Sequence, residues 1–150
     1  HHLGKIGIPD HVLLKFDTLS PQERAACEQH TVIGEQILAP LRPDPRALQM
    51  VRSHHETWDG TGYPDGLAEE EIPFLARLLH IVDSYDAILS DKPYSLAASV
   101  REALAEIRIG SGRQFDPHLA RQFVAMLQDE YAHEDDSEEL MHSIAHHAKD

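Results

Sequence analysis

The sequence has few of the features that would place a protein outside the cell or in a membrane. Cys27 is its single cysteine, so no disulfide can form within the chain. A chain of 150 residues buries roughly 70% of the surface that its unfolded form exposes, and such a core needs no disulfide. No apolar run approaches the roughly 20 residues that cross a bilayer, and no segment resembles a signal peptide. We therefore expect a cytoplasmic protein of one domain with no membrane segment.

Basic side chains are scarce. Lysine and arginine number 13 against 26 aspartates and glutamates, and the net charge is −13. Residues 129–150 alone hold eight acidic side chains and one lysine. Polynucleotide binding rests on lysine and arginine at the phosphates, so we expect no nucleic-acid polymer as a partner. A smaller phosphate-containing substrate would need a local source of positive charge, and the 12 histidines indicate where to look for it.

Helical signals run through almost the whole chain. Residues 20–23 (SPQE) combine an N-cap serine, a proline in the first turn and a capping-box glutamate. Residues 58–66 contain three glycines and a proline, and we expect a loop there. The segment 72–90 is apolar almost all the way round, which predicts that it lies at the centre of the core. Since no alternating strand pattern competes, the sequence predicts an all-α fold with helices over about residues 20–38, 44–56, 72–90, 99–110 and 116–128.

Histidines and buried acids are the candidates for chemistry. His54 and His55 are adjacent at the end of a predicted helix, so their side chains point about 100° apart and could reach two neighbouring ions. Asp83 lies within the most apolar helix, where a carboxylate is costly unless it is paired or binds a metal. His30 lies in the first long helix. Each of them also has an ordinary explanation, since single helical histidines are more often core or surface groups and Asp83 could serve as an N-cap or in a salt bridge.

Residues 54–67, HHETWDGTGYPDGL, resemble the signature HHExxDGxGYP of HD-GYP domains without a mismatch. A match of this length rarely arises by chance. The similarity extends to the end of the family motif HDIGKIGIPD, to its HPxIG segment and to its metal-aspartate helix. The matching segments are residues 3–10, 13–21, 30–34, 81–87, 91–94 and 115–117, and the resemblance covers roughly residues 1–128.

The HD-GYP family consists of all-helical hydrolases of cyclic di-GMP with two or three clustered metal ions, often iron or manganese. The resemblance therefore implies an HD-domain-like helical bundle over residues 1–130, with N-terminal helices of the family missing, and an acidic polar tail over residues 131–150. It implies metal-dependent hydrolysis of cyclic di-GMP to pGpG, to GMP or to both. Two divalent metal ions about 3.5–4 Å apart suit this reaction, because they can bind the attacking and the leaving oxygen of a phosphodiester.

The site residues follow from the same resemblance, position by position. The implied catalytic residues are Lys5, beside the scissile phosphate, and Asp83. The residues expected to bind substrate are Gly62, Tyr63, Pro64 and Lys92. The implied metal ligands are His1, His2 (in place of an aspartate), His30, His54, His55 and Asp83.

The first metal motif departs from the family pattern, which has His-Asp where this chain has His1-His2. A carboxylate has two oxygens that can bridge two ions, whereas a neutral imidazole has one acceptor nitrogen. Three alternatives stay open: two metals held by other bridges, a single metal, or tag residues at positions 1 and 2. Ser95 replaces the usual arginine. His80 stands where the family has a small apolar residue; we expect a partly buried histidine, with support of the metal site as the alternative.

These departures leave a second hypothesis for the function. A degenerate module of the same family would bind metal, nucleotide or a partner protein without efficient catalysis. Signalling proteins or an upstream sensor domain are the partners that this hypothesis implies. A phosphohydrolase of another nucleotide is a third hypothesis, and the intact Gly-Tyr-Pro loop argues against it.

Overall fold

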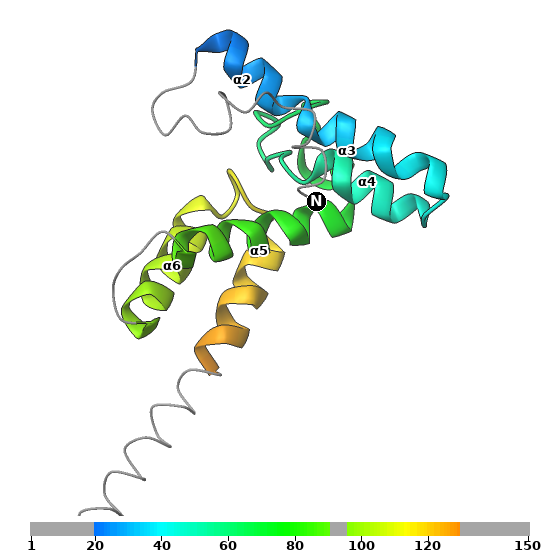
Figure 1. Ribbon diagram of the computed structural model, residues 1–150. Coiled ribbons are helices and arrows are strands. Elements are labelled where there is room, and N and C mark those ends of the chain that lie inside the picture. The colour runs from blue at the N-terminus through cyan, green and yellow to red at the C-terminus, as the bar shows by residue number, and fades with distance from the viewer. Residues whose placement is uncertain (1–19, 91–95, 130–150) are drawn as a thin grey trace, which may run out of the picture.

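Figure 1 shows the computed structural model, which describes residues 20–90 and 96–129. Every regular element in these two ranges is a helix, which confirms the all-α prediction. None of these helices is both long enough and apolar enough to cross a bilayer. The predicted acidic tail at 131–150 lies outside the described residues. The elements are α2 (Pro21–Glu28), α3 (His30–Leu38), η2 (Ala39–Leu41), α4 (Pro45–Ser53), η3 (Glu69–Glu71), α5 (Phe74–Ser90), α6 (Leu96–Gly110) and a last helix over residues 117–129.

The first predicted helix is wrong in one respect, because residues 20–38 form two helices rather than one. Nδ1 of His30 lies 2.6 Å from the carbonyl oxygen of Cys27, and the hydroxyl of Thr31 donates to the carbonyl of Glu28 at 3.1 Å. Side chains thus bind two carbonyls that a continuous helix would offer to its own N–H groups. The break places His30 at the first position of α3.

Helix α4 begins where the sequence predicts and ends three residues early. A side-chain oxygen of Asp44 caps its N-terminus, 2.8 Å from a backbone nitrogen. The helix ends at Ser53, whose carbonyl accepts the N–H of Glu56 at 3.0 Å in the turn that follows. His54 and His55 therefore lie just beyond the end of the helix rather than within it.

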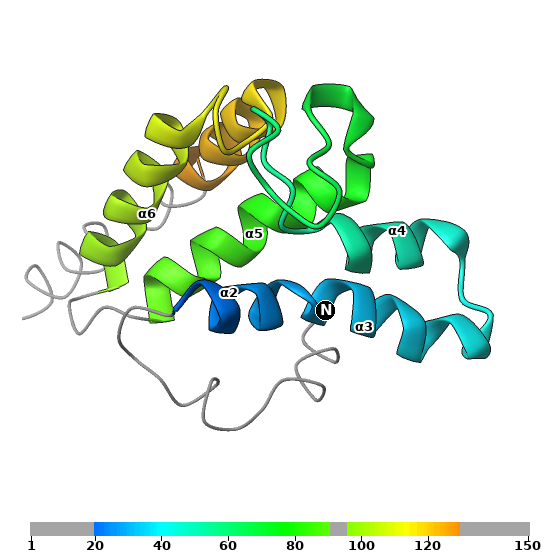
Figure 2. The same ribbon diagram turned by 90° about the horizontal axis from the view of Figure 1, so that it is seen from above.

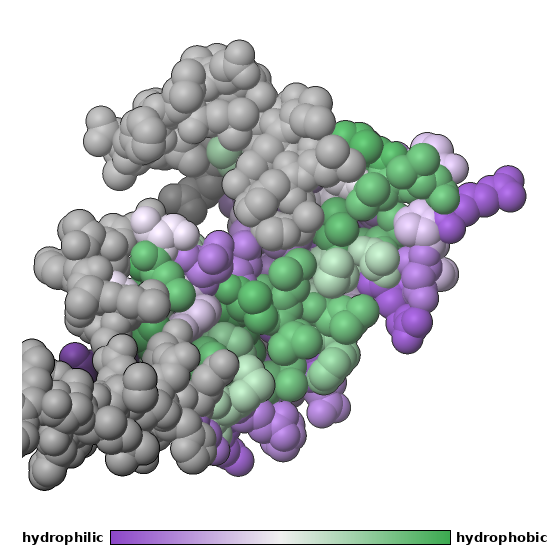
Figure 3. All heavy atoms as spheres, turned by 60° about the horizontal axis from the view of Figure 1, so that its bottom comes forward, coloured by the Kyte–Doolittle hydropathy of each residue, from purple (hydrophilic) through white to green (hydrophobic). Residues whose placement is uncertain are grey.

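Helix α5 lies at the centre of the fold, as the sequence predicts, but it is not buried on all sides. It packs against both α4 and α6. Ala76, His80 and Ile81 are buried, whereas Phe74 is 55% exposed and Val82 is 42% exposed. Neighbours on two sides bury only the residues that face them, so the remaining apolar side chains stay at the surface. Figure 3 shows a continuous apolar area on one face of the molecule, bordered by hydrophilic side chains.

A hydrophobic core joins α5, α6 and the last helix. In both ribbon views α3 and α4 lie side by side in the other half of the molecule, and α5 runs between the two halves (Figures 1 and 2). Helix α5 therefore connects the core to the helices that carry the histidines. The buried members of the core are Ile81, Val100, Leu104, Ile107, Phe115, Leu119, Ala120 and Val124.

A buried ion pair ties α5 to the last helix. Arg77 and Asp116 are 2.6 Å apart, with side chains that are 15% and 5% exposed. The other carboxylate oxygen of Asp116 accepts the backbone N–H groups of His118 (2.8 Å) and Leu119 (3.2 Å), which caps the last helix. The guanidinium of Arg77 also lies 5.9 Å from the ring centroid of Trp58. The Arg77–Asp116 pair thus links α5 to the last helix, and Arg77 also contacts the loop after α4.

Replacing this carboxylate should destabilise the fold strongly. Asp116→Ala should lower the free energy of unfolding by about 3–5 kcal/mol, because it leaves the Arg77 guanidinium buried without its partner and removes the helix cap. Chemical denaturation followed by circular dichroism measures this loss. Asp44→Ala, which removes an exposed cap, is the matched control and should cost clearly less. Equal losses in the two variants would contradict the importance of burial at Asp116.

Candidate metal centre

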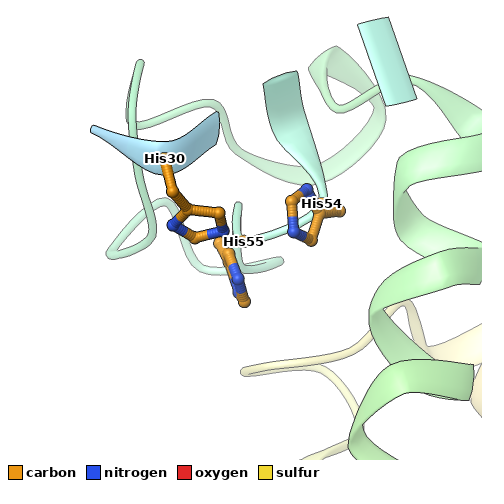
Figure 4. A group of neighbouring side chains, drawn as sticks. All are labelled: His30, His54 and His55. Carbon is orange, nitrogen blue, oxygen red and sulfur yellow. The ribbon is translucent and has the colours of Figure 1, made fainter. Parts of the chain in front are cut away.

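Three histidines from two helices meet at one place (Figure 4). His30 opens α3, His54 and His55 follow α4, and these two helices pack against each other. One possible ligand atom from each histidine lies within 4.8 Å of the other two. His30 and His54 are buried, with 4% and 0% of their surface exposed. The structure thus brings together three of the residues that the sequence predicts as metal ligands.

Backbone carbonyls orient two of the rings. Nδ1 of His30 lies 2.6 Å from the carbonyl oxygen of Cys27, and Nδ1 of His54 lies 2.8 Å from that of Val51. A carbonyl only accepts, so each Nδ1 carries the proton and each Nε2 presents its lone pair. Nε2 of His30 is buried and has no hydrogen-bond partner in the described part of the chain. Because a buried nitrogen with an unused lone pair is costly, and because metal-binding histidines usually donate their other ring N–H in this way, a divalent metal ion fits these residues.

Burial keeps His54 and His55 uncharged. It lowers the pKa of His54 to about 4. Burial also lowers the pKa of His55 to about 3, and the neighbouring His54 adds to that effect. Both imidazoles are therefore neutral near pH 7, which is the form that binds metals.

Asp83 lies near the cluster but outside the group of three histidines whose ligand atoms are in mutual reach. From α5 its charge raises the pKa of His54, His55 and His80, although burial has the larger and opposite effect on each. The side chain of Asp83 is half-buried. Its predicted role as a metal ligand stays a prediction.

The loop after the histidine pair folds back over the cluster. A Cβ atom at Gly62 would lie 2.4 Å from the backbone nitrogen of Thr57 and 2.5 Å from the carbonyl oxygen of His55, so only glycine fits there. The N–H of Tyr63 donates to that same carbonyl of His55 at 3.2 Å. The ring of Tyr63 stacks on His55, with centroids 5.0 Å apart and planes at 30°. The peptide bond between Tyr63 and Pro64 is cis. Of the four residues predicted to bind substrate, Gly62 and Tyr63 thus lie beside His55, and Pro64 follows them in the chain.

Two buried residues support this arrangement. The carboxylate of Glu56 accepts the N–H groups of Asp65 (2.7 Å) and Leu67 (3.0 Å), and sequence reasoning assigned it no role although it directly follows the histidine pair. His80 is 9% exposed, and its Nδ1 lies 2.7 Å from the carbonyl oxygen of His54. His80 is therefore a buried histidine that binds the backbone of His54, and its support of the metal site stays a prediction.

Four predicted site residues lie outside the described residues: His1, His2, Lys5 and Lys92. Ser95, the other departure from the family pattern, lies outside them as well. Their roles stay predictions.

Comparison with known proteins matches the chain to one family. The sequence model of the HD domain matches residues 1–119. A cyclic di-GMP phosphodiesterase from Thermotoga maritima is 40% identical over 145 residues, which are 92% of this chain and 39% of the relative. A 3′3′-cGAMP-specific phosphodiesterase from Vibrio cholerae is 34% identical over 134 residues, which are 87% of this chain and 29% of the relative. The chain thus spans less than half the length of these two relatives.

A solved structure supports the fold. An HDG"Y"P protein from Bdellovibrio bacteriovorus superposes with a TM-score of 0.64 over 85% of this chain and 40% of that protein, at 23% identity. This likeness confirms the predicted HD-domain-like helical bundle.

The stability of the metal-free protein should depend on pH in a way that reports the buried histidines. The pKa of His54 and His55 is about 4 and 3 in the folded state, against 6.5 for an exposed histidine. Below pH 6.5 the unfolded chain therefore takes up protons that the folded protein does not, and the free energy of unfolding should fall as the pH drops towards 5. Urea titrations at a series of pH values measure this slope, above the range where most carboxyl groups titrate.

The matched variants are His55→Gln, which should flatten the slope, and His118→Gln, which changes an exposed histidine and should leave the slope as it is. A His55→Gln slope equal to that of the unmodified protein would show that the half-buried ring of His55 is not its cause.

Proposed function

Because the chain belongs to the HD domain family and carries the HD-GYP signature, we propose that it is a metal-dependent phosphodiesterase that hydrolyses cyclic di-GMP to pGpG, to GMP or to both. The observation that carries the proposal is the cluster of His30, His54 and His55 with the ring of Tyr63 stacked against it. Neutral imidazoles beside a glycine-rich loop suit a metal that binds phosphate.

The names of the relatives support the substrate class. One relative is named a cyclic di-GMP phosphodiesterase and another a 3′3′-cGAMP-specific phosphodiesterase. Both names describe enzymes that act on cyclic dinucleotides, so we propose this class for the chain, with cyclic di-GMP first. An assay that offers cyclic di-GMP and 3′3′-cGAMP at equal concentration tests which of the two the protein hydrolyses faster.

We propose two divalent metal ions per site, iron or manganese. His30, His54 and His55 would hold metal through ring nitrogens, and we assign Asp83, His1 and His2 as the remaining ligands. Mixed nitrogen and carboxylate donors suit these metals. A bound ion supplies positive charge to the phosphate and acts as a Lewis acid.

The chain's own residues would bind and orient the substrate. The net charge of −13 repels an anionic dinucleotide, so cationic groups at the site must offset that repulsion. We assign Lys5 to the scissile phosphate, where its ammonium group stabilises the leaving 3′-oxygen, and Lys92 to a second substrate contact. Tyr63 offers an aromatic ring to a base, and Gly62 lets the loop backbone lie close to the histidines.

Removing one histidine should lower both the metal content and the turnover. His54→Ala should lower the metal content by at least one ion per chain and reduce the turnover of cyclic di-GMP by roughly a hundredfold or more, because the site loses one of its three clustered ring nitrogens. Elemental analysis of untagged protein and a turnover assay with added iron(II) or manganese measure the two effects. Asp83→Ala should act in the same direction, and His118→Ala should change neither. Full metal content in His54→Ala or Asp83→Ala would remove that residue from the ligand set.

His2 favours a second candidate function. An imidazole at this position has one acceptor nitrogen and does not bridge two ions as a carboxylate does. A site with such a change would bind metal, nucleotide or a partner protein without efficient turnover. It would then pass a signal to a protein partner or to an upstream sensor domain.

Restoring the carboxylate separates the two candidates. His2→Asp should raise the metal content and the turnover, because an aspartate can hold two ions close together. A rise from a rate that is already measurable supports the phosphodiesterase, whereas a rise from no measurable rate supports the signalling module. No change in either quantity would show that position 2 is not part of the site.

A further inference from the structure

Glu56 is a buried acid beside the histidine cluster. It directly follows the histidine pair, and 2% of its surface is exposed. No arginine, lysine or histidine within residues 20–90 or 96–129 forms an ion pair with it. Burial of a carboxylate without a cation is costly unless hydrogen bonds satisfy its oxygens.

Both oxygens of Glu56 bind the same stretch of backbone. Oε1 accepts the N–H of Asp65 at 2.7 Å, and Oε2 accepts the N–H of Leu67 at 3.0 Å. Hydrogen bonds to an ionised acceptor are stronger than those between neutral groups. Glu56 therefore holds the second half of the loop against the residue that follows the histidines.

The held segment carries the ring that covers the cluster. Tyr63 lies two residues before Asp65, and its ring centroid is 5.0 Å from that of His55 and 6.4 Å from that of His30. Its own N–H is bonded to the carbonyl of His55 at 3.2 Å. The segment from Tyr63 to Leu67 is thus attached at one end to His55 and at the other to Glu56.

A second attachment of the loop is more exposed. Arg52 binds the carboxylate of Asp65 with two hydrogen bonds (2.7 and 2.8 Å) and also binds Glu35 (2.7 Å). These three side chains are 32%, 37% and 30% exposed. Each of these side chains is about one-third exposed, so solvent weakens this attachment relative to the buried one. The two attachments meet at Asp65, one through its backbone and one through its side chain, so they can be removed separately.

We propose that Glu56 is a positioning residue of the site: its carboxylate holds the loop of residues 62–67 so that Tyr63 stays against the histidines, and it binds neither metal nor substrate itself. Its effect on turnover rests on the proposed phosphodiesterase function. Its effect on the loop does not, and can be measured without metal or substrate.

The test is hydrogen–deuterium exchange of the metal-free protein with Glu56→Gln. Glutamine keeps the shape but turns one acceptor into an NH₂ group that faces a backbone N–H. The amides of residues 62–68 should exchange roughly tenfold faster or more, while those of α6 keep their rate. Asp65→Asn, which removes the charge that pairs with Arg52, is the matched control and should change exchange by less than roughly threefold. Unchanged exchange in Glu56→Gln would overturn the proposal.

Metal and kinetic measurements separate positioning from ligation. Glu56→Gln should keep the full metal content, and its KM for cyclic di-GMP should rise roughly tenfold with a smaller change in kcat, since the loop shapes the substrate side. Loss of metal would make Glu56 a ligand and overturn the proposal. If the unmodified protein turns over no cyclic dinucleotide, the proposed function fails, but exchange still decides the role of Glu56. Should Glu56→Gln not fold, Glu56→Asp takes its place, and wild-type protection in that shorter variant would overturn the proposal.

Discussion

The candidate centre depends on one hydrogen bond that occurs twice. His30 and His54 each bind, through Nδ1, the carbonyl of the residue three positions earlier, Cys27 in α2 and Val51 in α4. Carbonyls in the last turn of a helix have no N–H partner within the helix, so the ring N–H of the histidine that follows can donate to one of them. The same bond gives a free carbonyl at the end of the helix a hydrogen-bond partner and places the ring proton on Nδ1. It also turns Nε2 away from the helix. Since α3 packs against α4, the two rings then meet.

The position of the histidines at helix ends also affects the electrostatics of the candidate centre. The C-terminal end of α4 carries the negative end of its helix dipole, which favours a cation near the histidines that follow it. Asp83 adds a negative charge from α5. Burial opposes a proton on His54 and His55, because a buried imidazole that takes up a proton becomes a charged group in a poorly solvated place. The cluster therefore disfavours protons and suits a metal ion, which several ligands hold at once.

Much of this could be predicted from the sequence, and the failures have physical reasons. Proline and capping residues mark the helix at 44–56, and the adjacent histidines at its end were found as candidates because they stand out in composition. The break before His30 could not be predicted, because both sides of it are helix-forming and only the side-chain bond to Cys27 distinguishes them. The role of Glu56 could not be predicted, because it depends on the loop bringing the N–H of Asp65, nine residues later, back to its carboxylate. No periodic pattern in the sequence indicates where a loop returns. Phe74 is exposed because few elements pack on α5, and the apolar pattern of a helix does not indicate how many neighbours it has.

The site is not independent of the core. Helix α5 holds the histidine pair through His80, whose ring binds the carbonyl of His54, and one turn away it holds the last helix through Arg77 and Asp116. The segment before that helix in turn binds the loop, since the N–H of Trp58 donates to the carbonyl of Gln114 at 3.1 Å. The histidines, the loop and the core thus share one helix as their common support. A shift of α5 would move the backbone of His54 and the loop together, so the packing of that helix sets how precisely the candidate ligands are placed.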